Sequence, residues 1–168
     1  MYKTGDVIVY SAHGLCRIED ITDRTIQDVT RTYYVMHPLA HPDLTISCPV
    51  DSDKVLMLDS MDEDQAEHIL RSFLKPGVSW VDDYRQRSAK YKENVKTGDR
   101  MIIAQTANTL MLKEIDQSKR NKHLYETDRR LLGDIQNVLF NELALSLNTT
   151  FEEIEKQVKD MIYDRTIA

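Results

Sequence analysis

The segment from residue 79 to residue 100 contains the side chains best suited to bind a nucleic acid. It holds Trp80, the only tryptophan of the chain, and tyrosines interspersed with basic residues. A basic helix with aromatic rings between its charges can follow a phosphate backbone and offer a ring to a groove or to an unstacked base. The candidate DNA-binding residues of this segment are Trp80, Tyr84, Arg85, Arg87, Lys90 and Lys92.

The same segment also has a structural interpretation, in which a solvated helix packs its aromatic rings on neighbouring helices. Asp82 and Asp83 favour this alternative, because carboxylates repel phosphate. A second basic cluster, with Lys119 and Arg120 as candidate DNA contacts, lies in a predicted turn, where it can reach phosphates or simply remain solvated. The sequence leaves both interpretations open for both groups.

No other chemistry has a comparable motif. The sequence lacks the phosphate-binding loop, the dinucleotide-binding glycine pattern, the zinc-protease motif and the serine-nucleophile motif. His37 and His41 share a proline-containing loop, but they lack the thiol or carboxylate partners that a metal site needs. We therefore predict a protein that is not an enzyme and that binds no metal or cofactor.

The overall charge limits how DNA would be bound. The 168 residues carry a formal net charge of −6, whereas a free-standing nucleic-acid-binding domain usually has a strong basic excess. Any DNA contact therefore needs a local basic surface and a second partner that brings the chain to DNA. The two cysteines lack a C-x-x-C spacing, and neither a signal-peptide pattern nor an apolar run of the ~20 residues that cross a bilayer occurs. These features predict a cytoplasmic protein without a membrane partner.

The elements that must position these residues change type near residue 59. Up to that point the chain has short runs rich in β-branched and apolar residues, separated by turn residues. Five strands without a helix among them predict a small antiparallel β-barrel of the SH3/Tudor type over residues 1–59. The predicted strands are Val7–Tyr10, Leu15–Ile21, Thr32–Met36, Leu44–Val50 and Val55–Leu58.

From residue 60 onward, apolar residues recur at helical spacing. Ser60 and Glu63 form a capping-box pattern that predicts the first helix start. Ser79 is predicted to cap a helix that contains Trp80, and Asp99 to cap the next one. We predict an all-α bundle of about five helices over residues 60–168, and hence an α+β chain of two domains.

Several motifs occur in an order that resembles the CarD/CdnL family of bacterial transcription regulators over nearly the whole length. The first domain also resembles the RNA-polymerase-interacting module of transcription–repair coupling factors. No single motif is specific, but their order and separations together favour this family. The motifs are Gly5–Tyr10, His13-Gly14, Leu44–Pro49, Trp80–Tyr84, Gly98-Asp99 and Glu126–Leu147.

The resemblance implies a transcription regulator that docks on the β subunit of RNA polymerase and contacts promoter DNA. Docking would pair an edge strand of the N-terminal domain with polymerase, and the helical domain would meet DNA at the upstream edge of the melted −10 region. There Trp80 would enter the minor groove and stabilise the open complex. By position, the polymerase-binding residues would be Arg24, Leu44, Thr45, Ile46, Ser47, Cys48 and Pro49.

The sequence departs from the family pattern at positions that matter for both contacts. Ser47 stands where an arginine is common in the polymerase-facing strand, and Asp82 and Asp83 stand where arginines commonly follow the tryptophan. An alternative function is therefore a protein–protein adaptor that binds polymerase or another partner without touching DNA. In either case we expect a monomer, associated with the nucleoid through RNA polymerase.

Overall fold

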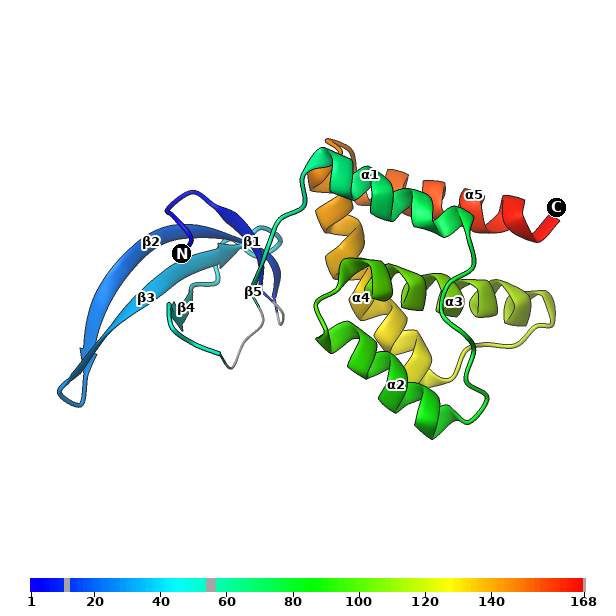
Figure 1. Cartoon of the computed structure of the whole chain (residues 1–168), viewed down its shortest axis with the longest axis horizontal. Helices are drawn as coiled ribbons and strands as arrows, with labels where there is room; N and C mark the ends of the chain where they lie inside the picture. Colours follow the sequence, from blue (N-terminus) through cyan, green and yellow to red (C-terminus); the bar gives the residue numbers. More distant parts are fainter. Residues whose placement is uncertain (11–12, 54–56, 168) are drawn as a thin grey trace. The chain divides into compact units, whose positions relative to one another are not determined.

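The structure is a computed structural model that describes residues 1–10, 13–53 and 57–167. It divides into two compact units, Met1–Ser60 and Met61–Ala168. The first is built from strands and the second from helices (Figure 1). Each unit has its own cluster of buried apolar side chains, and each is described below by itself.

The N-terminal unit is an antiparallel sheet with the strand order β4-β3-β2-β1-β5. Gly14 opens β2 with a φ of 69°, a conformation that suits glycine because it has no Cβ. The long hairpin of β2 and β3 turns at Gln27 and Asp28, which both have positive φ, as a tight two-residue hairpin turn requires. The strands are β1 (Val7–Tyr10), β2 (Gly14–Ile26), β3 (Val29–Pro38), β4 (Ile46–Pro49) and β5 (Met57–Asp59).

The predicted α+β class and antiparallel sheet are confirmed, but the closed barrel is not. Among the described residues, β4 and β5 form the two edges of the sheet and no pairing joins them. β1 has the predicted bounds, whereas β2 continues past Ile21 to Ile26 because its polar end is paired with β3. The predicted residues 55 and 56 of the fifth strand lie outside the described residues.

The core of the sheet unit is small and contains both cysteines. Cys16 and Cys48 are buried free thiols, and burial raises the pKa of Cys16 to about 11. Ile18 and Met36 face each other across β2 and β3 and are fully buried. The buried residues of this core are Ile8, Tyr10, Cys16, Ile18, Tyr34, Met36 and Cys48.

The described part of the C-terminal unit contains five α-helices and one short 3-10 helix. The first helix starts after Asp62 rather than Ser60, because Asp62 and Gln65 exchange side-chain and backbone hydrogen bonds in a capping box. Asp99 caps α3 as predicted, accepting from the backbone N–H groups of Met101 and Ile102. The helices are α1 (Glu63–Arg71), η1 (Ser72–Leu74), α2 (Tyr84–Lys96), α3 (Arg100–Lys119), α4 (Glu126–Ser146) and α5 (Phe151–Ile167).

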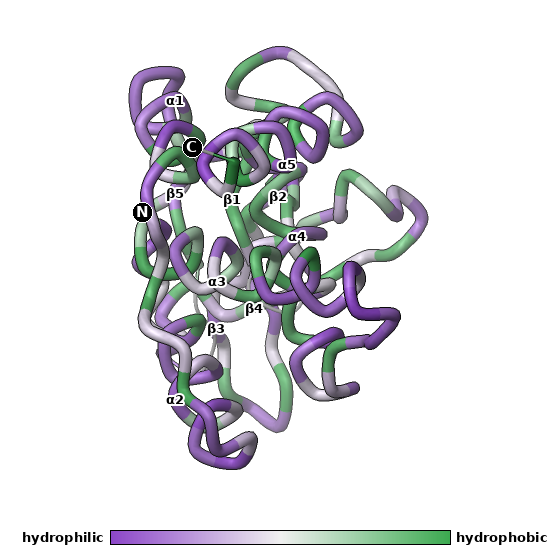
Figure 2. The backbone as a smooth tube through the Cα atoms, turned by 90° about the vertical axis from the view of Figure 1, so that its right-hand side faces the viewer, coloured by the Kyte–Doolittle hydropathy of each residue, from purple (hydrophilic) through white to green (hydrophobic). Residues whose placement is uncertain are grey.

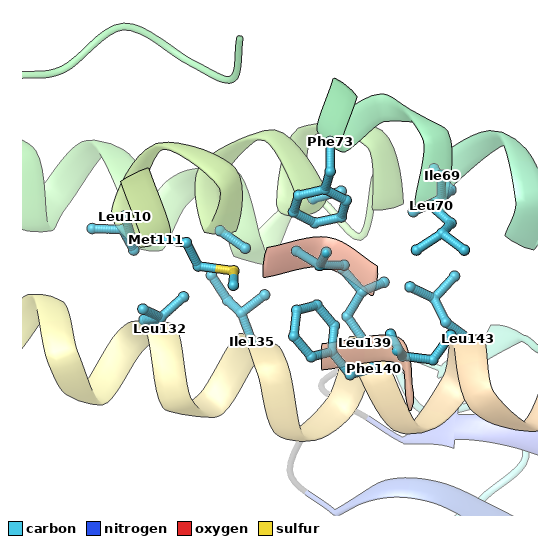
Figure 3. Packing of buried hydrophobic residues seen from close by; sticks show 14 of the residues in the cluster. Ile69, Leu70, Phe73, Leu110, Met111, Leu132, Ile135, Leu139, Phe140 and Leu143 are labelled. Atoms are coloured by element: carbon cyan, nitrogen blue, oxygen red, sulfur yellow. The ribbon is translucent and has the colours of Figure 1, made fainter. Parts of the chain in front are cut away.

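Helix α3 lies at the centre of this unit, with buried residues on most sides of its middle turns. Phe73 of η1 points toward Phe140 of α4, with 6.2 Å between ring centroids, and Met111 of α3 lies near Leu132 on α4 (Figure 3). Helix α2 is the most hydrophilic of the five (Figure 2). None of the helices in the described residues has the length and apolar character needed to cross a membrane.

Candidate nucleic-acid interface

Trp80 lies in the irregular segment between η1 and α2, not within a helix as predicted. Helix α2 starts only at Tyr84, because the Asp83 carboxylate accepts from the backbone N–H groups of Arg85 and Gln86 and so caps it. The Trp80 ring is partly buried, with the Lys113 ammonium 4.9 Å from its centroid. The position of Trp80 is therefore set by tertiary contacts rather than by helical geometry.

The backbone on both sides of Trp80 is fixed against the unit. The chain at Gly77 approaches α3 so closely that a Cβ there would lie 2.2 Å from the backbone oxygen of Gln105. The Thr109 hydroxyl then donates to the carbonyl of Val78 over 2.6 Å, and the Tyr91 hydroxyl donates to the carbonyl of Ser79 over 2.8 Å. These contacts leave the tryptophan on a short, well-anchored segment.

Arg87 is buried and is therefore not a phosphate contact, which corrects the prediction made from its charge. Its side chain is 1% exposed and donates to both carboxylate oxygens of Asp128, with the shortest bond 2.7 Å long. Its remaining terminal nitrogen donates to the carbonyls of Val81 and Asp82. The guanidinium carbon lies 4.2 Å from the centroid of the Trp80 ring. Arg87 thus connects α2, α4 and the tryptophan segment.

Two exposed tyrosines stack beside this buried pair. Tyr84 and Tyr125 have ring centroids 5.6 Å apart and an interplanar angle of 20°. The Arg85 side chain lies over the Tyr84 ring, 5.6 Å from its centroid, and its Nε donates to the Tyr84 hydroxyl. Tyr125 and Lys113 were not among the predicted site residues. Lys113 follows Thr109 by one turn of α3, which is a weak signal, and Tyr125 immediately precedes α4, where no local pattern indicates its role.

The other basic candidates are exposed and lie further from the tryptophan along their helices. Lys90 and Lys92 project from α2. Lys119 is the last residue of helix α3 and does not lie in a turn as predicted. Arg120 follows it and forms an exposed ion pair with Asp116 at 4.0 Å. A shallow hollow of 390 Å³ runs along α3 beside Trp80, and it is lined by Trp80, Thr109, Leu112, Lys113 and Asp116.

The predicted polymerase-binding strand lies at an edge of the sheet. β4 pairs with β3 on one side, and Ser47 accepts a 3.0 Å hydrogen bond from Arg24 of β2. Leu44 is 42% exposed, and Thr45 is also exposed, just before the strand. Cys48 points into the core and is 2% exposed, so its side chain is not available to a partner; Ile46 and Pro49 are half-buried.

These features define a class of protein that works through its surfaces. An open sheet edge lies in one unit and an aromatic, partly basic surface in the other. Within the described residues, no three His, Cys, Asp or Glu side chains gather as a metal site would require. The open sheet edge and the aromatic surface are both typical of binding to other macromolecules.

Comparisons with known proteins identify the family. Residues 2–59 match the model of the CarD-like/TRCF RID domain, and residues 68–159 match that of the CarD C-terminal domain. The chain belongs to the CarD-like family of transcription factors, which interact with RNA polymerase. It is also 26% identical over 162 residues, 95% of this chain and 98% of the relative, to the "Putative transcription factor YdeB" of Bacillus subtilis (strain 168). The resemblance predicted from the motifs is confirmed.

Proposed function

We propose that this protein docks on the β subunit of RNA polymerase through its N-terminal unit and contacts promoter DNA at the upstream edge of the −10 bubble through its helical unit. Bound there as a monomer, it stabilises the open complex. The observation that supports this function is the anchored Trp80, which has the buried Arg87 at 4.2 Å and Lys113 at 4.9 Å from its ring centroid.

The polymerase contact is proposed at the β4 edge. An edge strand offers unpaired backbone groups to a strand of a partner, and flanking side chains add specificity. Here Arg24 and Ser47 would form the polar part of that surface, and the exposed Leu44 the apolar part. Ser47 holds the Arg24 guanidinium near the strand, which partly offsets the absence of an arginine at position 47.

The DNA contact is proposed around Trp80. Tyr84, Arg85 and Lys113 would line it, and Lys90, Lys92, Lys119 and Arg120 would reach phosphates around it. Asp83 weakens this contact less than its charge suggests, because its carboxylate accepts two backbone N–H groups at the positive end of α2. The resulting surface has aromatic rings at its centre and basic side chains around them.

Such a surface needs tethering. Even basic proteins bind DNA non-specifically with a Kd of about 10⁻⁴ to 10⁻⁶ M, and a chain of net charge −6 should bind more weakly. Docking on polymerase would raise the effective DNA concentration to the order of mM. Trp80 then shifts the equilibrium between closed and open complexes by its differential affinity alone, and ~1.4 kcal/mol changes their ratio tenfold.

The test uses point variants of the full chain. Arg24→Glu should weaken binding to the polymerase β subunit, while Arg17→Glu, an exposed residue of the same strand, should not. Trp80→Ala should shorten the lifetime of the open complex without changing polymerase binding, and Trp80→Phe should retain part of the effect. An unchanged lifetime with Trp80→Ala would show that the DNA contact is wrong.

A protein–protein adaptor without DNA contact is the second candidate function. The net charge of −6 and the exposed Asp82 favour it. Under this alternative, Arg24→Glu abolishes the effect on transcription, whereas Trp80→Ala has none. The two variants therefore separate the two functions.

A further inference from the structure

The stacked pair of Tyr84 and Tyr125 leaves a large aromatic surface in water. The two residues are 46% and 64% exposed although their rings contact each other. By contrast, Tyr10, Tyr34 and Tyr91 are buried. A planar exposed aromatic surface is the feature on which unpaired nucleic-acid bases stack, because every base has a π-face.

We propose that this pair is a stacking platform for an unpaired base of single-stranded DNA. The inference rests on the proposed function only in that the base would come from promoter DNA melted beside Trp80. It adds a ligand class, single-stranded DNA, and one residue, Tyr125, beside Tyr84 of the proposed DNA contact.

The pair is held rigidly, which lowers the entropic cost of binding. Tyr84 is the first residue of α2, and Tyr125 is the N-cap of α4. One turn further along each helix, Arg87 and Asp128 form the buried ion pair that joins the same two helix starts. The Arg87 guanidinium carbon also lies 5.6 Å from the centroid of the Tyr125 ring. The platform therefore has an exposed aromatic layer over a buried ionic layer.

The charges around the platform are nearly balanced, which favours stacking over phosphate neutralisation. The Asp83 carboxylate is bound by backbone amides. Glu126 accepts hydrogen bonds from Arg129 and Arg130, which lower the pKa of its carboxyl. Arg85 is the cation in direct contact with the pair, since its guanidinium lies over the Tyr84 ring and its Nε donates to the Tyr84 hydroxyl. A single engaged cation predicts a shallow salt dependence, with a slope of about −0.7 on a single strand.

The experiment measures binding of the full chain, without polymerase, to a labelled oligothymidine of about twelve nucleotides and to a duplex of the same length. Wild type should bind the single strand with a Kd no tighter than about 10⁻⁴ M, the weak end of the non-specific range. Tyr125→Ala should weaken this binding about tenfold, which corresponds to ~1.4 kcal/mol. Tyr125→Phe should bind like wild type, because it keeps the ring.

Tyr163→Ala is the matched control, because Tyr163 is 47% exposed and also has a cation, Lys119, over its ring. It should leave the affinity for the single strand unchanged. The proposal is overturned if Tyr125→Ala binds like wild type, if Tyr163→Ala loses as much affinity, or if single strand and duplex lose affinity equally. It is also overturned if wild type shows no binding at a protein concentration of ten times the expected Kd. That result would indicate that the tyrosine pair contacts a protein instead of DNA. A Tyr125→Leu variant serves if the alanine variant unfolds.

The outcomes separate this proposal from the proposed function. Loss of the platform effect with a normal Trp80→Ala effect on open-complex lifetime overturns the platform alone. Intact single-strand binding with no Trp80→Ala effect overturns the open-complex function alone. The first assay contains no polymerase, so a failed docking contact cannot influence it.

Discussion

Replacing Asp128 with Asn should strongly destabilise the helical unit. The change removes the counter-charge of Arg87, a guanidinium that is 1% exposed, while keeping the size of the side chain. Breaking a buried ion pair by removing one partner costs about 3–5 kcal/mol, because the remaining charge is left uncompensated. For a unit of about 100 residues, each kcal/mol corresponds to a shift in Tm of ~4–8 °C. We therefore expect Tm to fall by more than about 10 °C.

Trp80 is a built-in reporter for this experiment, since it is the only tryptophan and lies in the helical unit. Its fluorescence should follow the unfolding of that unit, and the native emission of Asp128→Asn should shift to the red as the segment at Val81 loosens. Glu126→Gln, in the first turn of the same helix, is the matched control. Its ion pairs are exposed, so its transition should remain nearly unchanged.

A double variant separates stability from positioning. Arg87→Met combined with Asp128→Leu removes both charges, and such apolar replacements of buried ion pairs are often neutral or stabilising. Stability should recover, but the bonds to the carbonyls of Val81 and Asp82 are lost, so the effect of Trp80 on the open complex should be smaller than in wild type. If Asp128→Asn shifts Tm no more than Glu126→Gln, the buried ion pair does not stabilise the unit. If the double variant behaves like wild type on promoters, Arg87 does not position Trp80.

Three further predictions follow from single contacts. Gly77→Ala should destabilise the helical unit in urea unfolding, because a Cβ would lie 2.2 Å from a backbone oxygen of α3, whereas Gly133→Ala, in open space on α4, should stabilise it by about 0.5–1 kcal/mol. Burial raises the pKa of Glu142 despite Arg100, so the folded state favours its protonated form and loses stability as the pH rises above the unfolded value. The stability of Glu142→Gln relative to wild type should accordingly increase between acid and neutral pH, and a constant difference would contradict this. Cys16, with a pKa of about 11, should resist alkylation in the native protein and react only after unfolding, as a thiol titration would show.

Local patterns in the sequence predicted the elements that depend on local interactions. The first strand and the Asp99 cap were found because each is specified within a few residues. The first helix start was misplaced because two overlapping patterns compete, one beginning at Ser60 and one at Asp62. Both have the spacing of a capping box, and the structure uses the second.

Features that depend on distant residues could not be predicted in the same way. Arg87 resembled its basic neighbours in a polar segment, and its partner Asp128 is 41 residues away. Closure of the sheet likewise depends on whether its two edge strands meet, which no local pattern specifies. The sequence therefore located the surface that carries Trp80 but misassigned the residue that holds it.

This reassignment changes how the helical unit should respond to salt. If the candidate basic residues all bound phosphate, the effect on the open complex would fall steeply as ionic strength rises. With Arg87 buried and the central contacts aromatic, the ratio of open-complex lifetimes between wild type and Trp80→Ala should be nearly independent of salt. Polymerase occupancy, which involves the exposed Arg24, can still decrease. Lifetimes measured at saturating protein and two ionic strengths test this, because both proteins keep every basic residue and a ratio that falls with salt would show that the Trp80 contribution itself depends on charge.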